Sequence, residues 1–195
     1  MPQYYPHTRH PNVHPVKLTS GDKADNEAAI AEIKETAGQL DVIIASAGIS
    51  KQYGRLATAS LSDGAQAPLG LSNRLADHSV HLYRCGVPST YYHMSASAYA
   101  ASKAAANFLI KVLDAEHSAL ISMAIHPGWV ATDIGNIAAA SNRLSQAPVT
   151  VKDSVAGVLS RIDRATKEKS SGRFWNFKAV KDGMPWDVPT EEVLW

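Results

Sequence analysis

The chain has 195 residues, of which 45% are hydrophobic and 19% charged, and its formal net charge is +1. This composition is typical of a globular protein with one core, and the charge gives no electrostatic reason to expect nucleic acid or an anionic membrane as a partner. No apolar run approaches the roughly 18 residues needed to cross a bilayer, and the single cysteine, Cys85, excludes an internal disulfide, so we expect a cytoplasmic location.

The N-terminal part of the sequence predicts an irregular tail, an edge strand and a helix. Residues 1–11 are rich in proline and histidine, and these histidines have no carboxylate or cysteine beside them, so no metal site is predicted. Residues 13–18 (VHPVKL) predict a short strand, which Pro15 confines to the edge of a sheet. Residues 23–39 predict a helix that Gly38 ends.

The rest of the chain predicts alternating strands and helices. Apolar runs that end in Gly or Pro-Gly predict buried strands, and runs with a 3.6-residue period predict helices. In chain order, the predicted elements are a strand at 40–48, a helix at 95–117, a strand at 119–130, an amphipathic helix at 151–168 and a strand at 171–177. Residues 51–94 show no clear period and predict at most one short strand, at 80–87.

This alternation predicts an α/β fold with a parallel sheet and helices on both of its faces. The strands are too apolar for a sheet with one face in water. The helix at 151–168 carries Val155, Val158, Leu159 and Ile162 on one apolar face. Since alternation of this kind is typical of doubly wound folds, we expect residues 1–195 to form a single Rossmann-like domain.

Tyr99 and Lys103 are the residues of the helix at 95–117 that suggest chemistry. They are four residues apart, so both side chains leave the same face of a helix. A phenol with a pKa near 10 transfers protons poorly at neutral pH, but an ammonium within a few ångströms stabilises the phenolate. Such a pair can act as a general acid toward a carbonyl or as a general base toward an alcohol. On spacing alone, a packed tyrosine beside a solvated lysine is the simpler interpretation.

Three motifs, in the right order along the chain, resemble the short-chain dehydrogenase/reductase family. YAASKAAANFL at 99–109 resembles the family's Tyr-x-x-x-Lys helix, and LDVIIASAGIS at 40–50 resembles its Asn-Ala-Gly strand end. IHPGWVATDIG at 125–135 resembles its Pro-Gly-x-Val-x-Thr segment. The tail at 171–186 is similar to the end of a fungal subgroup that includes norsolorinic acid ketoreductase-like proteins. The resemblance implies an NAD(P)-dependent oxidoreductase that reduces a ketone or oxidises the matching alcohol.

The resemblance also implies catalytic roles for three residues. Tyr99 would protonate the substrate oxygen as a hydride arrives from a nicotinamide. Lys103 would lower the pKa of the tyrosine and hydrogen-bond the nicotinamide ribose. The family's catalytic serine ends the strand before the tyrosine helix, where this chain has Gly86, so Ser89 becomes the candidate and Ser95 the alternative.

The implied cofactor is NADP or NAD, with NADP favoured by the subgroup. Besides Tyr99 and Lys103, the residues that would contact it are Ala47, Gly48, Pro127, Gly128, Val130 and Thr132. The lack of a large side chain at Ala47 and Gly48 would let the cofactor approach the backbone. The Val130 backbone would face the nicotinamide carboxamide, and Thr132 would offer a hydroxyl nearby.

The sequence also departs from the family pattern. The N-terminal turn Thr-Gly-x-x-x-Gly-x-Gly, which anchors the pyrophosphate at a helix N-terminus, has no match here, so impaired cofactor binding is expected. The first two strands and the first helix of the fold are unmatched as well, which predicts an exposed edge at 41–45. Thr19 or Ser20 stands where the family holds the adenine with an acidic residue, and Ser46 replaces the family's asparagine.

An oxidoreductase with a small-molecule carbonyl or alcohol substrate is therefore expected, and two alternatives stay open. One is a catalytically inactive pseudoenzyme or interaction partner, which forms a homodimer or heterodimer through the helix of Tyr99 and Lys103. The alanines of that helix would allow the close approach of a second helix. The other is an incomplete gene model with a missing first exon and a mis-spliced middle.

Overall fold

The structure is a computed structural model that describes residues 13–19, 21–46, 80–81, 97–179 and 190–195. The chain forms two units, Met1–Leu40 and Asp41–Trp195. The described elements are α1 (Lys23–Ala37), β1 (Val80–His81), α3 (Ser97–Glu116), β2 (Ala124–His126), α4 (Asp133–Ser141), α5 (Val151–Asp163), α6 (Lys167–Ser170), β3 (Phe174–Asn176) and β4 (Glu192–Val193). The single domain expected over residues 1–195 stays a prediction.

Local capping explains where α1 begins and ends. The Asp22 carboxylate accepts a hydrogen bond of 3.1 Å from the Asp25 N–H, which has no partner within the helix. Gly38 has a φ of +79°, and its N–H donates to the Lys34 carbonyl. A glycine adopts this conformation without steric cost, so α1 ends there. The helix predicted at 23–39 is confirmed.

Residues 13–18 form no strand, so that prediction is wrong. Pro15 has no N–H to donate to a neighbouring strand. Lys17 instead forms an ion pair of 2.9 Å with Asp25, and the Thr19 hydroxyl donates to the same carboxylate. These contacts tie the segment to the first turn of α1 rather than to a sheet.

In the second unit, the described strands form one sheet in the order β1-β2-β3-β4. The first three strands are parallel, with Val80 opposite Ala124 and Ala124 opposite Phe174. β4 is antiparallel to β3 and places Val193 opposite Phe174. The strands predicted within 80–87, 119–130 and 171–177 are therefore confirmed as β1, β2 and β3. β2 and β3 are shorter than predicted, and residues 82–87 lie outside the described residues.

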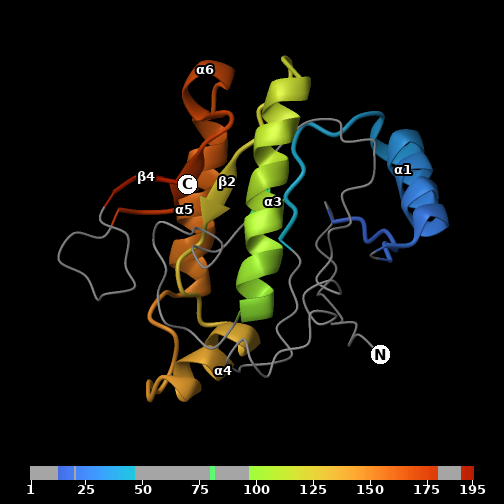
Figure 1. The fold of residues 1–195 in the computed structure, drawn as a ribbon. Coiled ribbons are helices and arrows are strands. Elements are labelled where there is room, and N and C mark those ends of the chain that lie inside the picture. Colours follow the sequence, from blue (N-terminus) through green and yellow to red (C-terminus); the bar gives the residue numbers. More distant parts are fainter. Residues whose placement is uncertain (1–12, 20, 47–79, 82–96, 180–189) are drawn as a thin grey trace. The chain divides into compact units, whose positions relative to one another are not determined.

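The two faces of the sheet pack against different helices (Figure 1). On one face, Ile110 of α3 packs against Ala124 and Phe174. On the other face, Val158 of α5 belongs to the same apolar cluster as Ile125. Ala124 and Ile125 are neighbours on β2, and successive strand residues point to opposite faces, so this strand separates two apolar clusters. The predicted α/β architecture with helices on both faces of a parallel sheet is confirmed.

The strand predicted at 40–48 is the clearest error in the described residues. Residues 41–46 form no continuous strand, and Val42 and Ile44 are 40% and 43% exposed. An apolar, β-branched run becomes a buried strand only where strands beside it and helices above it cover both of its faces. Here two of its apolar side chains lie open to solvent.

The helices predicted at 95–117 and 151–168 are confirmed as α3 and α5, but the apolar face of α5 is only partly buried. Val158 is buried, whereas Val155 and Leu159 are exposed. Successive helix residues are about 100° apart around the axis. Because Val158 faces the sheet, Leu159 lies at the edge of the contact between α5 and the sheet.

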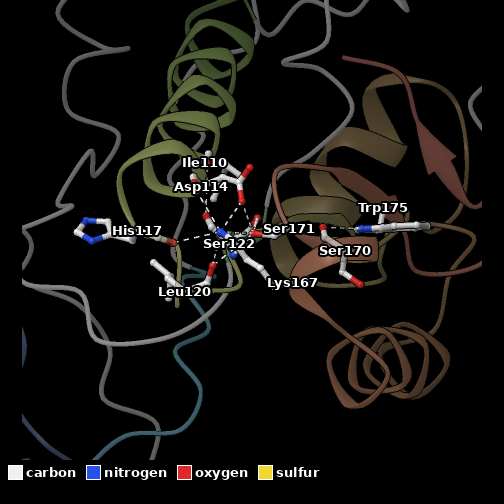
Figure 2. Close-up of polar contacts among 9 residues, drawn as sticks. All are labelled: Ile110, Asp114, His117, Leu120, Ser122, Lys167, Ser170, Ser171 and Trp175. Carbon is white, nitrogen blue, oxygen red and sulfur yellow. Dashed lines mark hydrogen bonds and ion pairs between the residues drawn. The ribbon is translucent and has the colours of Figure 1, made fainter.

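A lysine from α6 holds the C-terminal end of α3 (Figure 2). The Lys167 ammonium donates to the Asp114 carboxylate and to the Leu120 carbonyl, each at 2.8 Å, and to the His117 carbonyl at 3.1 Å. The Ser171 hydroxyl donates to the same carboxylate. The Lys167 ammonium also donates to the Asp114 carbonyl of α3 at 3.2 Å. Because the last carbonyls of a helix lack partners within it, this ammonium caps the end of α3 and ties it to the segment that follows.

Candidate active site

Tyr99 and Lys103 lie one turn apart near the start of α3. The Lys103 ammonium is 5.4 Å from the centroid of the Tyr99 ring, within the range of a cation–π contact. Lys103 is 8% exposed, and this burial lowers the pKa of its ammonium. Tyr99 is half-buried. The pair therefore has an enclosed cation and a phenol that keeps some contact with solvent.

The burial of Lys103 follows from its position on α3. Lys103, Asn107 and Ile110 are spaced by four and three residues, which places them on one face of the helix. All three are buried, and Ile110 packs on the sheet. The face of α3 that carries Lys103 is therefore the face that meets the sheet.

Pro127 and Gly128 follow β2 directly, and a neighbouring side chain constrains each of them. The Ser154 hydroxyl of α5 donates to the Pro127 carbonyl at 2.7 Å. Gly128 has a φ of +83°, and a Cβ at this position would lie 2.7 Å from Cε1 of Phe177. Both observations exclude a side chain at Gly128, so the glycine has a structural reason here as well as the role that the family resemblance gives it.

Val130 and Thr132 lie between β2 and α4. Val130 forms a parallel bridge with Val149, in which the flanking Ala131 N–H donates to the Val149 carbonyl at 2.8 Å. The N–H and C=O of Val130 itself consequently point away from Val149. Thr132 is the N-cap of α4, and its hydroxyl oxygen accepts a hydrogen bond of 3.2 Å from the Gly135 N–H.

The structure brings the predicted residues together in two groups. Tyr99 and Lys103 share one turn of α3, and Pro127, Gly128, Val130 and Thr132 share the connection from β2 to α4. Ala47, Gly48 and Ser89, with the alternative Ser95, lie outside the described residues. The two described groups belong to elements that meet at the cluster around Ile110 and Ala124.

Three residues that hold these groups are absent from the sequence prediction. Ser154 holds Pro127 through its hydroxyl. The sequence could have indicated this residue, because a serine one turn before Val158 lies on the buried face of an amphipathic helix. Trp129 donates from its indole N–H to the Gly135 carbonyl at 2.9 Å. No local sequence pattern marks Trp129 or Gly135 for this contact.

Among the described residues, no three or more His, Cys, Asp or Glu side chains gather in a way that could hold a metal ion. None of their helices combines the length and the apolar character that crossing a membrane requires.

Comparison with known proteins identifies relatives over most of the chain. A norsolorinic acid ketoreductase of Aspergillus parasiticus is 34% identical over 181 residues, which cover 82% of this chain and 67% of that protein. A norsolorinic acid ketoreductase of Emericella nidulans is 34% identical over 192 residues, 88% of this chain and 73% of that protein. No protein-family model matches the chain.

Solved structures give the same picture of the fold. The NADPH-bound carbonyl reductase from chicken fatty liver matches with a TM-score of 0.70 and 26% identity, over 86% of this chain and 76% of that one. The carbonyl reductase Sniffer of D. melanogaster matches with a TM-score of 0.67 and 22% identity, over 86% and 77% of the two chains. With about a third of its residues identical over at least two thirds of the ketoreductases above, the chain belongs to the short-chain dehydrogenase/reductase family of oxidoreductases.

Proposed function

We propose that the chain is an NADP(H)-dependent ketoreductase in which Tyr99 is the general acid. The observation that carries this proposal is the pair on α3, where the Lys103 ammonium lies 5.4 Å from the Tyr99 ring centroid. Its relatives of about one-third identity are ketoreductases, and the carbonyl reductase of 26% identity is NADPH-bound. These likenesses favour a ketone as substrate and NADPH as reductant.

In the proposed reaction, Tyr99 donates its phenolic proton to the carbonyl oxygen of the ketone. Lys103 stabilises the phenolate that remains, because a cation close to an oxyanion favours its charged form. In the reverse direction, the phenolate takes the proton of the alcohol. Ser89 is proposed, by the family resemblance, to hydrogen-bond the same substrate oxygen.

The chemistry of the candidate cofactor residues suits a nicotinamide nucleotide. Lys103 offers an ammonium to the ribose, and the Val130 N–H points away from Val149 and is a donor suited to the carboxamide. Pro127 and Gly128 would form the wall beside the ring, and Ala47 and Gly48 would let the backbone approach it. When bound, the nicotinamide supplies the hydride.

The proposal is tested with the purified chain. Binding is followed by the change in NADPH fluorescence, and turnover by the loss of NADPH absorbance with an aromatic ketone. Tyr99→Phe is expected to retain NADPH binding while its turnover falls by about 10²-fold or more, since a general acid contributes that much. Lys103→Met is expected to weaken both. A wild-type chain that neither binds nor oxidises NADPH would refute the proposal.

A second candidate function, that of a non-catalytic interaction partner, is favoured by one observation. Phe108 of α3 is 68% exposed and follows the exposed Ala101 and Ala105 at spacings that put all three on one face of the helix. Small residues beside a large apolar one allow another helix to pack closely. Co-purification with an intact member of the family, in the absence of NADPH oxidation, would support this candidate over the enzyme.

A further inference from the structure

Buried polar side chains come from the face of α3 that carries Lys103 and from the strands that this face meets. We call Asn107, His126 and Asn176 the polar layer; they are 4%, 8% and 1% exposed. Burying an amide or imidazole costs free energy unless its polar atoms are satisfied. Apolar residues at these positions would extend the cluster around Ile110, so packing alone does not explain why polar residues occupy them.

The strand pattern puts two members of the polar layer on the α3 side of the sheet. Ala124 and Phe174 contact Ile110 of α3. Side chains two residues further along a strand point to the same face. These residues are His126 on β2 and Asn176 on β3, and the two are paired in the register of the strands.

The direction of α3 places the polar layer between the apolar cluster around Ile110 and Lys103. β1 and β2 are parallel and α3 connects them, so α3 runs antiparallel to β2, as Figure 1 shows. The direction along α3 from Ile110 to Lys103 is therefore the same as the direction along β2 from Ala124 to His126. Asn107 is the intermediate residue of that helix face. The sequence of layers is the apolar cluster, the polar layer, the lysine and then Tyr99.

We propose that Asn107 and His126 are positioning residues for Lys103: they keep the surroundings of its ammonium polar, so that the enclosed lysine stays charged and directed at Tyr99. This inference rests on the proposed function of the Tyr99–Lys103 pair. Apolar side chains around the lysine would favour its neutral amine, and a neutral amine would not stabilise the Tyr99 phenolate.

The physical basis is the cost of a charge in apolar surroundings. Burial lowers the pKa of Lys103, and no carboxylate of the described residues is among the causes that act on it. Besides the Tyr99 ring, the amide and imidazole dipoles of the polar layer are then neutral groups that can stabilise the cation. On the described elements along this face, the titratable side chains are Tyr99 on α3 and, by strand register, His126 on β2, whereas β3 contributes Asn176, which does not titrate.

The first test is made on the wild-type chain without cofactor or substrate. Trace labelling with acetic anhydride, mapped by mass spectrometry, gives the pH at which half of each lysine is deprotonated. Lys152, exposed on α5, is the internal reference. We expect the midpoint of Lys103 below that of Lys152 but above neutral pH. A midpoint below neutral pH would overturn the proposal, because the lysine would then be uncharged where the pair has to work.

The second test changes the polar layer. Asn107→Leu and His126→Leu are expected to lower the labelling midpoint of Lys103 by about one pH unit, which is roughly a tenfold faster labelling at a fixed pH below it. Asn107→Gln and His126→Asn, which keep a polar side chain, are expected to stay near the wild type. Ile110→Val is the matched control for a change in packing alone, and it should leave the midpoint unchanged.

The outcomes separate this inference from the proposed function. Leucine variants that are folded by circular dichroism and label like the wild type overturn the inference; if they do not fold, the wild-type midpoint and the two polar variants still decide it. In turnover, the leucine variants should move the alkaline limb of the kcat profile to lower pH with little change in KM. A wild-type chain that labels as expected but neither binds nor oxidises NADPH refutes the proposed function alone.

Discussion

Gly135, in the first turn of α4, is a glycine with very little room beside the β2–α4 connection. A Cβ at this position would lie 1.9 Å from the Val130 carbonyl oxygen, and that oxygen belongs to the backbone. We expect Gly135→Ala to lower the free energy of unfolding by about 2–3 kcal/mol, because the connection must shift to admit a methyl group. Urea unfolding followed by circular dichroism measures this loss. Ala140→Gly, at an exposed position of α4, should cost only about 1 kcal/mol through helix propensity, and equal losses in both variants would contradict the argument.

The Asp114 carboxyl links stability to pH. The hydrogen bond from Lys167, and after it the one from Ser171, hold the pKa of this carboxyl below its usual value. Its contribution to stability is therefore complete above the unfolded pKa of about 3.9 and is lost as pH falls through the lower folded pKa. The stability advantage of the wild type over Asp114→Asn should shrink in acid, which urea midpoints across an acid series measure. An advantage that stays constant in acid would show that the carboxyl titrates normally.

Sequence and structure supply different information about single residues of the site. The four-residue spacing of Tyr99 and Lys103 and the Pro127-Gly128 pair can be recognised from the sequence, because helix periodicity and turn chemistry are local properties. The reason that Gly128 carries no side chain is Phe177, which follows it only after the whole of α4 and α5. Contacts between residues so far apart leave no periodic signal.

At the scale of elements, Lys167 of α6 is the residue that joins the end of α3 to the C-terminal half of the chain (Figure 2). Lys167→Met keeps most of the length of the side chain and removes the ammonium that the Leu120 and His117 carbonyls share. Hydrogen bonds from a charged group are worth about 1.5–3 kcal/mol, so we expect a loss of roughly 2–3 kcal/mol in the free energy of unfolding. Urea unfolding checks the value.

The matched control for this lysine lies two residues further along the chain. Lys169 is exposed, and Lys169→Met should change the unfolding free energy by less than about 0.5 kcal/mol. If both methionine variants lose little stability, the contacts of Lys167 are exchanged for water without cost. In that case the end of α3 is held by the Ile110 cluster alone.

Elements with a long periodic pattern could be predicted from the sequence, and elements that depend on their neighbours could not. α1, α3 and α5 are long enough to show a 3.6-residue period or a capping signal. α6 and β4 have four and two residues, too few for any period. The run at 40–48 has the composition of a buried strand, but burial is decided by what covers the segment, and that information lies elsewhere in the chain.

At the scale of the whole molecule, the exposed apolar side chains are spread over several elements. In the second unit they include Phe108, Ile137, Val151, Val155, Leu159 and Leu194. Single exposed apolar residues are common on protein surfaces and need no explanation. Phe108 differs because Ala101 and Ala105 on the same helix face are small, so the backbone of a second helix can come close. The face of α3 opposite the sheet is therefore the surface on which we expect two copies to associate.

Phe108→Asp tests this association. We expect the wild-type chain to elute from size-exclusion chromatography as a dimer and the variant as a monomer, because a carboxylate at the centre of the contact would lose its hydration. The free energy of unfolding measured on the monomer should hardly change, since Phe108 is 68% exposed within one chain. Leu194→Asp, at a position that is 77% exposed on the C-terminal side of β4, is the control and should leave the dimer intact. A wild-type chain that stays monomeric across a concentration series, or a Phe108→Asp variant that still dimerises, would show that α3 faces water on this side.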